Sequence, residues 1–282
     1  FFYQLLYLNK IPVATIGTLG IKFKNKIKKI TLTSPDIISL HSELHNLKKK
    51  GVQNVIIEAS SHGLHQGRLG GIRFKAGIFT NFSQDHLDYH KTMKNYLEAK
   101  LMLFSKQIYK NNFAIADNEE KKFLQIKKIT KKRKIKLIII KNKFLNIGEK
   151  AKLIGSFQLK NLKMSSCAAK ICGLSEKKIN NTLHLIRPVE GRLELIKEFA
   201  NMSKVFIDYA HTPNALYTAV TSLKKHFNSD VTLVFGCGGN RDFKKRPLMA
   251  KVAKTLSNKI FVTDDNPRKE NPKKIRNEII KY

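Results

Sequence analysis

In TNFSQDHLDYHKTMKNYLEAK, residues 80–100, acidic, imidazole and amide side chains gather just before a helical pattern. The run before it, residues 72–79, has the apolar composition of a strand. After it, apolar residues recur at helical intervals, at Met93, Tyr96, Leu97, Leu101 and Phe104. We therefore predict a loop between a strand and a helix, and the crowding of reactive side chains indicates a catalytic role for this loop.

Lys100 falls on the apolar stripe of the predicted helix. Two interpretations remain open: its long side chain extends to water, or a desolvated lysine loses its proton more easily and takes part in chemistry. In the loop itself, four side chains offer oxygen and nitrogen ligands within one turn of chain, which favours a metal or phosphate site: Asp85, His86, Asp88 and His90.

The length of 282 residues predicts two domains. With 54 Lys and Arg against 21 Asp and Glu, the formal net charge is +33, which would ordinarily suggest a nucleic-acid partner. The lysines are spread along the whole chain instead of forming one patch, so biased composition explains the charge at least as well. We expect no nucleic-acid partner, although the positive field would attract an anionic nucleotide substrate.

The cysteines Cys167, Cys172 and Cys237 have no C-x-x-C spacing, which argues against a disulfide framework or zinc site and fits a reducing compartment. No apolar run reaches the roughly 18 residues of a membrane-spanning helix. Residues 1–8 lack the features of a signal peptide. The sequence predicts a cytoplasmic protein without membrane insertion, and we expect a monomer.

Further strands are predicted in the first half of the chain. Residues 52–59 form a compact apolar strand with Glu58 near its end, where open α/β sheets bind ligands. Residues 13–19 resemble a buried strand that ends in glycine, and TLTSPD at 31–36 precedes a helical pattern. Residues 113–117 and 136–141 predict two strands around a lysine-rich helix.

The second half has a different organisation. We predict domains at 1–190 and 191–282, separated after the break at Pro188. Strands at 205–209, 231–235 and 260–263 alternate with helices that begin at Pro213 and Lys245, and this βαβ pattern implies a parallel sheet. The glycine cluster GCGGN at 236–240 lacks the full G-x-G-x-x-G and is weak evidence for a dinucleotide site.

The stretch at 80–100 resembles the corresponding stretch of the Mur ligases, most nearly of the member that adds the third amino acid to UDP-N-acetylmuramoyl-L-alanyl-D-glutamate. Further motifs are similar to the same family in the same order: EASSHGLHQGR, GSFQLKN, GRLE, DYAHTP, GCGGNRD, KRPLM and DDNPR. The resemblance implies an α/β fold with a parallel-sheet central ATPase domain and part of a Rossmann-like C-terminal domain. The family's glycine-rich P-loop does not occur in the sequence, so we expect an internal fragment that is inactive alone.

The resemblance also implies roles for single residues. It makes Glu58, His86 and Lys100 catalytic magnesium ligands, with Lys100 as a carbamate formed with carbon dioxide. It assigns ATP contacts to Asn161, Arg192, Asp208 and His211. It assigns substrate contacts to Thr33, Ser34, Ser60, Gln66, Arg68, Arg241, Asp265, Asn266, Pro267 and Arg268. Two positions depart from the family pattern, because Ser34 replaces a threonine and Gln158 replaces an asparagine.

The activity implied is ATP-dependent ligation of an amino acid to UDP-N-acetylmuramoyl-L-alanyl-D-glutamate through an acyl phosphate, in peptidoglycan synthesis. Arg268 and Arg241 resemble two arginines at the amino-acid site of the ligases that use meso-2,6-diaminopimelate. The resemblance therefore implies this substrate over L-lysine, because an arginine pairs with the distal carboxylate that lysine lacks. The alternatives are an L-lysine-adding Mur ligase, a folylpolyglutamate synthetase-like ligase and a basic nucleic-acid-binding protein. A folylpolyglutamate synthetase would not be expected to carry SSHGLHQGR together with DNPR.

Overall fold

The computed structural model describes residues 1–141, 147 and 150–282, and the chain divides into two compact units. Unit 1 comprises residues 1–82, 94–152 and 159–187, and unit 2 comprises residues 83–93, 153–158 and 188–282. The polar part of the predicted loop therefore groups with unit 2, whereas almost all of the helix that follows it groups with unit 1.

The first sheet of unit 1 has the strand order β3-β2-β1-β4. β1 (Val13–Gly17) runs parallel to β4 (Asn54–Ile57), with Val13 opposite Asn54. β2 (Gly20–Phe23) and β3 (Lys26–Lys28) continue the sheet antiparallel. The strands predicted at 13–19 and 52–59 are thus confirmed, and Glu58 follows β4 directly.

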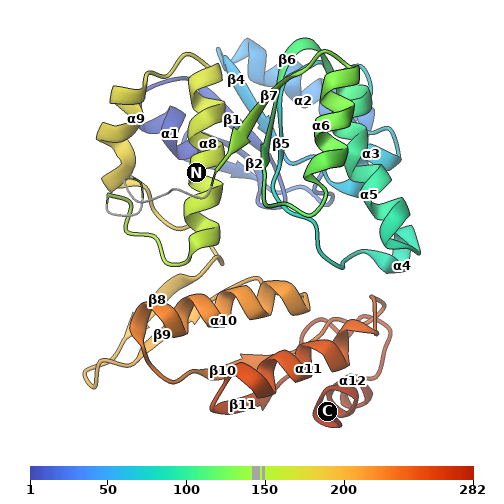
Figure 1. Cartoon of the computed structure of the whole chain (residues 1–282), viewed down its shortest axis with the longest axis vertical. Helices are drawn as coiled ribbons and strands as arrows, with labels where there is room; N and C mark the ends of the chain where they lie inside the picture. Colours follow the sequence, from blue (N-terminus) through green and yellow to red (C-terminus); the bar gives the residue numbers. More distant parts are fainter. Residues whose placement is uncertain (142–146, 148–149) are drawn as a thin grey trace. The chain divides into compact units, whose positions relative to one another are not determined.

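The second sheet of unit 1 is parallel and has the order β5-β6-β7. In β6 (Ile108–Asp117), Ala114 and Ala116 join one apolar cluster with Ile126 of α6 (Phe123–Lys132). Ile115 joins another cluster with Met164 of α8 (Ser156–Ile171). Alternate residues of a strand point to opposite faces, so helices cover both faces of this sheet, as Figure 1 shows for α6 and α8. The strands are β5 (Phe74–Phe79), β6 (Ile108–Asp117) and β7 (Lys136–Ile140).

Three helices of unit 1 form where the sequence predicted them: α2 (Ile37–Lys49), α5 (Met93–Met102) and the lysine-rich α6 (Phe123–Lys132). α5 begins at Met93 and continues into a π-helical turn, η1 (Leu103–Gln107), and α2 begins after Asp36, whose side chain accepts a hydrogen bond from the Ser39 amide at 2.9 Å. The remaining helices of unit 1 are α1 (Phe2–Leu8), α3 (Ser61–His65), α8 (Ser156–Ile171), α9 (Glu176–Thr182) and η2 (Leu183–Leu185).

Unit 2 is built around the parallel pair β10 (Thr232–Phe235) and β11 (Lys259–Val262). Its core joins Phe235 and Cys237 to apolar residues of three helices, drawn in orange and red in Figure 1. Desolvation in this core raises the pKa of the Cys237 thiol to about 11, so the thiol is neutral at pH 7. The helices are α10 (Pro213–Phe227), α11 (Lys245–Leu256) and α12 (Pro272–Ile280), and the short α4 (Leu87–His90) lies in the polar loop.

One sheet prediction needs correction. The strand predicted at 205–209 forms as β9 (Lys204–Ile207), but among the described residues it pairs antiparallel with β8 (Glu194–Glu198) and not with β10. β8 was not predicted from the sequence. Its connection to β9 is a short turn in which the Met202 amide donates to Phe199 O at 2.8 Å, and a turn of this length permits only antiparallel pairing.

In the described part of the chain, none of the helices has the length and apolar character needed to cross a bilayer.

Candidate active site

Glu58 is held at the carboxyl end of β4 by residues that follow the neighbouring strand β1. Its Oε2 accepts hydrogen bonds from the Thr18 amide at 2.8 Å and from the Thr18 hydroxyl at 2.9 Å. The hydroxyls of Thr18 and Thr33 lie 3.1 Å apart. A Cβ at Gly17 would come within 2.7 Å of the same carboxylate oxygen, so the glycine makes room for Glu58. Two predicted residues, Glu58 and Thr33, are thus brought together through Thr18.

Sequence reasoning missed Thr18. It lies one residue beyond β1, and β1 and β4 are parallel neighbours. The carboxyl ends of such neighbours share one edge of the sheet, which is the signal that could have identified Thr18 once the strand pairing was known.

A second group of hydroxyls lies behind Glu58. The Ser34 hydroxyl donates to Glu58 O at 2.9 Å and lies 3.0 Å from the Ser60 hydroxyl, which in turn caps α3 by accepting from the Gly63 amide. Arg68 Nη1 donates to Ser34 O at 3.0 Å. Ser34 is fully buried, and its predicted contact with substrate stays a prediction. Gln66 lies exposed at the end of α3.

Lys100 is half-buried among aromatic rings. Its Nζ lies 5.2 Å from the centroid of Phe79 and 5.5 Å from that of Tyr96, within the range of cation–π attraction. The amine thus lies beside aromatic rings, these contacts do not decide between the two interpretations of this lysine, and carbamylation stays a prediction. Glu58 and Lys100 belong to unit 1 and His86 to unit 2, so their joint action as magnesium ligands also stays a prediction.

The polar loop of unit 2 is organised around Asp85. Its Oδ2 lies 3.0 Å from His211 Nε2, and its Oδ1 accepts from the His86 amide at 2.9 Å. Burial raises the pKa of Asp85, but the hydrogen bond from His211 and the nearby positive groups outweigh burial and lower it to about 2. His86 adopts a left-handed backbone conformation with φ of 56°, unusual for a residue with a side chain, and such strain is often found at functional sites.

The remaining predicted nucleotide contacts are distributed over both units. Asp208 of unit 2 accepts from the Leu193 amide at 2.8 Å, and desolvation raises its pKa. Arg192 lies over the ring of Tyr209 at 4.9 Å. Asn161 lies in α8 of unit 1, where its carbonyl accepts from the Ser165 hydroxyl. The buried Gln158 donates to Ile154 O at 3.0 Å, which gives this departure from the family pattern a local structural role.

The glycine cluster at 236–240 packs against the DNPR loop. A Cβ at Gly239 would lie 2.0 Å from Pro267 O, and one at Gly236 would lie 2.4 Å from Thr263 O. The Gly239 amide donates to Asn266 O at 2.9 Å, and Arg268 Nη1 donates to Gly239 O at 2.8 Å. These glycines therefore permit a close approach between two protein loops. This packing gives the glycine cluster a structural role that does not require a dinucleotide.

The two predicted amino-acid-site arginines both belong to unit 2. Arg241 directly follows the glycine cluster and pairs with Asp88 at 3.3 Å, while Arg268 has a left-handed φ of 51°. Gln84 of the polar loop donates to Asp242 at 2.8 Å. Around the DNPR turn, Asn266 accepts from the Arg268 amide, Pro267 O accepts from the Glu270 amide, and Asp265 lies beside Gly236 and Gly238.

The donor set around Glu58 fits the magnesium that the fold family implies. It consists of a carboxylate and two hydroxyls, and hard oxygen ligands are those that Mg²⁺ prefers. Among the residues described, there is no group of three His, Cys, Asp or Glu side chains that could hold a metal by themselves.

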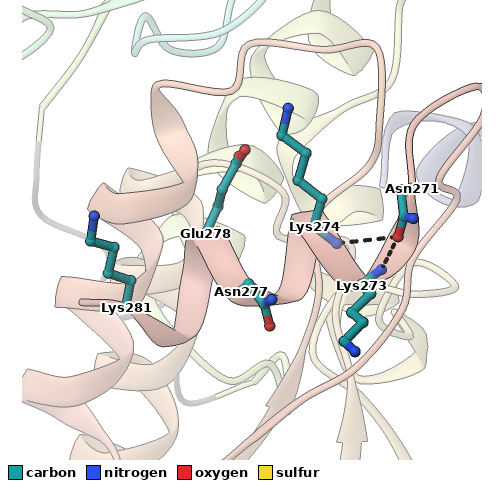
Figure 2. A pocket seen from close by; sticks show the side chains of 6 residues that line it. All are labelled: Asn271, Lys273, Lys274, Asn277, Glu278 and Lys281. Atoms are coloured by element: carbon teal, nitrogen blue, oxygen red, sulfur yellow. Dashed lines mark hydrogen bonds between the residues drawn. The ribbon is translucent and has the colours of Figure 1, made fainter.

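A hollow of about 470 Å³ lies along α12, and none of its lining residues was predicted for the site. Figure 2 shows its lining and the Asn271 side chain that caps the helix by accepting from the amides of Lys273 and Lys274, at 2.9 and 3.3 Å. Glu278, which also lines it, pairs with the buried Arg246. The lining residues are Asn271, Lys273, Lys274, Asn277, Glu278 and Lys281.

Comparisons with known proteins match both halves of the chain. The family model described as the Mur ligase middle domain matches residues 1–185, and that of the Mur ligase glutamate ligase domain matches residues 191–282. The UDP-N-acetylmuramoyl-L-alanyl-D-glutamate--2,6-diaminopimelate ligase of Rickettsia bellii (strain RML369-C) is 40% identical over 95% of this chain and 61% of its own length. The ligase of the same name from Zymomonas mobilis is 37% identical over 98% of this chain and 62% of its own length.

Solved structures agree in fold. A UDP-N-acetylmuramoyl-L-alanyl-D-glutamate--2,6-diaminopimelate ligase superimposes with a TM-score of 0.69 at 29% identity, covering 99% of this chain and 61% of that protein. A folylpolyglutamate synthase of Mycobacterium tuberculosis gives 0.74 at 13% identity, covering 99% of this chain and 75% of that protein, a likeness of fold alone. The chain spans about three fifths of the length of these two curated relatives from Rickettsia and Zymomonas. With a family model covering residues 1–185 and relatives of this identity along nearly its whole length, the chain belongs to the Mur ligase family.

Proposed function

We propose that this chain takes part in ATP-dependent ligation of meso-2,6-diaminopimelate to UDP-N-acetylmuramoyl-L-alanyl-D-glutamate, a cytoplasmic step of peptidoglycan precursor synthesis. The observation that carries the proposal is the pair of arginine-bearing loops in unit 2. Arg268 Nη1 donates a hydrogen bond to the carbonyl of Gly239, and Arg241 lies two residues after Gly239 in the same loop. The names of the relatives support the same substrates.

The two arginines suit an amino acid with two carboxylates. A guanidinium forms paired hydrogen bonds with a carboxylate, and diaminopimelate carries one at its distal end, where lysine has only an ammonium group. Two cations near that position would repel the lysine ammonium and attract the carboxylate. The loops therefore favour diaminopimelate over lysine.

In the proposed reaction, the terminal carboxylate of the UDP-linked substrate takes the γ-phosphoryl group of ATP to form an acyl phosphate, and ADP leaves. The incoming amine then displaces phosphate and loses a proton to form the amide. Magnesium, when bound, neutralises negative charge on the phosphoryl oxygens. Glu58 would hold it, oriented by Thr18, and Lys100 as a carbamate and His86 are the further ligands proposed. Arg68 and Ser60, beside Glu58, would orient the UDP-linked substrate, and His211 and Asp208 of unit 2 would face the nucleotide.

Binding of the two amino acids to the 282-residue chain tests the proposal. Isothermal titration calorimetry should show meso-diaminopimelate binding tighter than L-lysine by on the order of a hundredfold, since loss of a charge-assisted pair together with charge repulsion costs a few kcal/mol. Arg268→Ala should lose most of this preference. Arg187→Ala, which removes an exposed arginine of unit 1, is the matched control and should keep it.

Equal binding of the two amino acids, or unchanged selectivity in Arg268→Ala, would show that the arginine does not read the distal carboxylate. Single-stranded DNA is titrated alongside at two salt concentrations, because phosphate-backbone binding weakens steeply with salt. Tight, salt-sensitive DNA binding without diaminopimelate binding would favour the basic nucleic-acid-binding alternative instead.

A further inference from the structure

Arg246 is a buried cation. It lies in a sequence motif, but it has no role in the proposed function. It is the second residue of α11, in the KRPLM motif, and only 2% of it is exposed. A guanidinium stays charged in proteins, and a buried charge without partners is strongly unfavourable. The groups that bond to Arg246 therefore indicate its role.

Three separate segments of unit 2 meet at this guanidinium. Nη1 donates to Glu278 Oε2 of α12 at 2.6 Å. Nη2 donates to Glu270 Oε2 at 2.8 Å and to Gly238 O at 3.4 Å. Arg246 thus joins the glycine-rich loop, the segment after the DNPR turn and the last helix.

Glu270 extends this connection to the loops that carry the two site arginines. Its second carboxylate oxygen accepts from the amide of Asn240, the residue directly before Arg241. Two residues before Glu270 stands Arg268, whose Nη1 donates to Gly239 O, and the Lys269 amide donates to Asn240 Oδ1 at 2.9 Å. Through Glu270 and Gly238, one buried side chain therefore contacts both the Arg241 loop and the Arg268 loop, which also bond to each other directly.

Stability alone accounts poorly for this arrangement. Replacing buried ionic groups by apolar residues of similar volume often leaves a protein as stable or more stable, and Arg246 Nε has no hydrogen-bond partner among the described residues despite its burial. A charge kept in the core at this cost is better explained by the geometry that it imposes on the loops.

We infer that Arg246 is a positioning residue for amino-acid selection, acting through Glu270 and Gly238 to hold Arg241 and Arg268 at the separation that a distal carboxylate requires. The inference rests on the proposed function for the identity of the amino acid. The two carboxylates on Arg246 supply a matched test, because Glu270 also contacts the glycine-rich loop, whereas Glu278 reaches the guanidinium from α12.

The experiment measures meso-diaminopimelate and L-lysine binding by calorimetry in the 282-residue chain and in Arg246→Lys, Glu270→Ala and Glu278→Ala. Thermal unfolding of each variant is recorded alongside. Lysine keeps the charge at 246 but cannot form the two-pronged contact. Arg246→Lys and Glu270→Ala should weaken diaminopimelate binding about tenfold or more, as loss of a charge-assisted contact implies. Glu278→Ala should change it less than about threefold, and lysine binding should change little in all three.

A purely structural role would lower the unfolding temperature of all three variants while leaving the selectivity of the folded protein unchanged, and that result would overturn the inference. Equal losses in Glu270→Ala and Glu278→Ala would also overturn it. If Arg246→Lys does not fold, the comparison of the two glutamate variants decides. Failure of the unmodified chain to prefer diaminopimelate would instead refute the proposed function, so the two failures are distinguishable.

Discussion

At Gly239 and Gly238, neighbouring glycines face different obstacles. A Cβ at Gly239 would lie 2.0 Å from the backbone oxygen of Pro267, whereas one at Gly238 would lie 2.8 Å from the end of the flexible Arg268 side chain. Backbone held by a loop on both sides cannot move away as easily as a side chain can. An added methyl group at Gly239 would therefore have to displace backbone, whereas one at Gly238 would have to displace only a side chain.

Gly239→Ala should destabilise unit 2 by roughly 3 kcal/mol, since overpacking of this kind forces backbone shifts. Gly238→Ala should cost at most about 1 kcal/mol, because Arg268 can change its rotamer. Urea unfolding followed by circular dichroism measures both. Equal destabilisation by the two substitutions would contradict the close approach of the two loops.

Between elements, β6 and α8 are linked by an ion pair at the carboxyl end of β6. Asp117 is the last residue of β6 and is 1% exposed, and its Oδ2 accepts from Lys160 Nζ of α8 at 2.6 Å. Its Oδ1 accepts from the Glu119 amide at 3.0 Å, which shapes the turn after the strand. The pair fixes α8 against the parallel sheet one residue before Asn161, a predicted ATP contact.

Asp117→Ala should reduce the free energy of unfolding of unit 1 by about 3 kcal/mol, because it leaves the lysine and the Glu119 amide without their acceptor near the core. Lys170→Ala breaks the exposed pair with Glu176 and is the control, with an expected effect below about 1 kcal/mol. Urea unfolding of both variants checks this. A larger loss in Lys170→Ala than in Asp117→Ala would refute it.

For the whole molecule, the net charge of +33 is the dominant electrostatic property. Self-repulsion destabilises a compact state far from neutrality, and salt shortens the distance over which charges repel one another. The temperature of thermal unfolding should therefore rise by several degrees between about 20 and 300 mM sodium chloride, as screening increases.

Scanning calorimetry at several salt concentrations measures this rise. The control replaces four lysines of α6 by glutamine, which keeps helix propensity and lowers the charge: Lys127, Lys128, Lys131 and Lys132. That variant should be more stable at low salt and respond less to added salt. A fall in unfolding temperature with salt would show that attractive surface pairs outweigh the repulsion.

Local patterns in the sequence predicted most of the elements and the part of the site that lies at strand ends. β1, β4 and β5 formed where the apolar runs indicated, and Glu58 follows β4 as expected. The position of a strand depends on residues that are neighbours along the chain and on the burial of the strand itself. Both leave a pattern in a short stretch of sequence. The motifs likewise predicted the family, which the comparisons confirmed.

From the sequence alone came most of the helices and strands, the family that they build and the place of Glu58 at a strand end. The tertiary structure alone decided that β9 pairs with β8, that Thr18 holds Glu58, and that Arg246 joins three segments of unit 2. The physical reason is that these are contacts between residues distant in the chain, or between strands whose pairing is open until they pack. A buried arginine and an exposed one look the same in a sequence, and only the carboxylates that converge on it distinguish them.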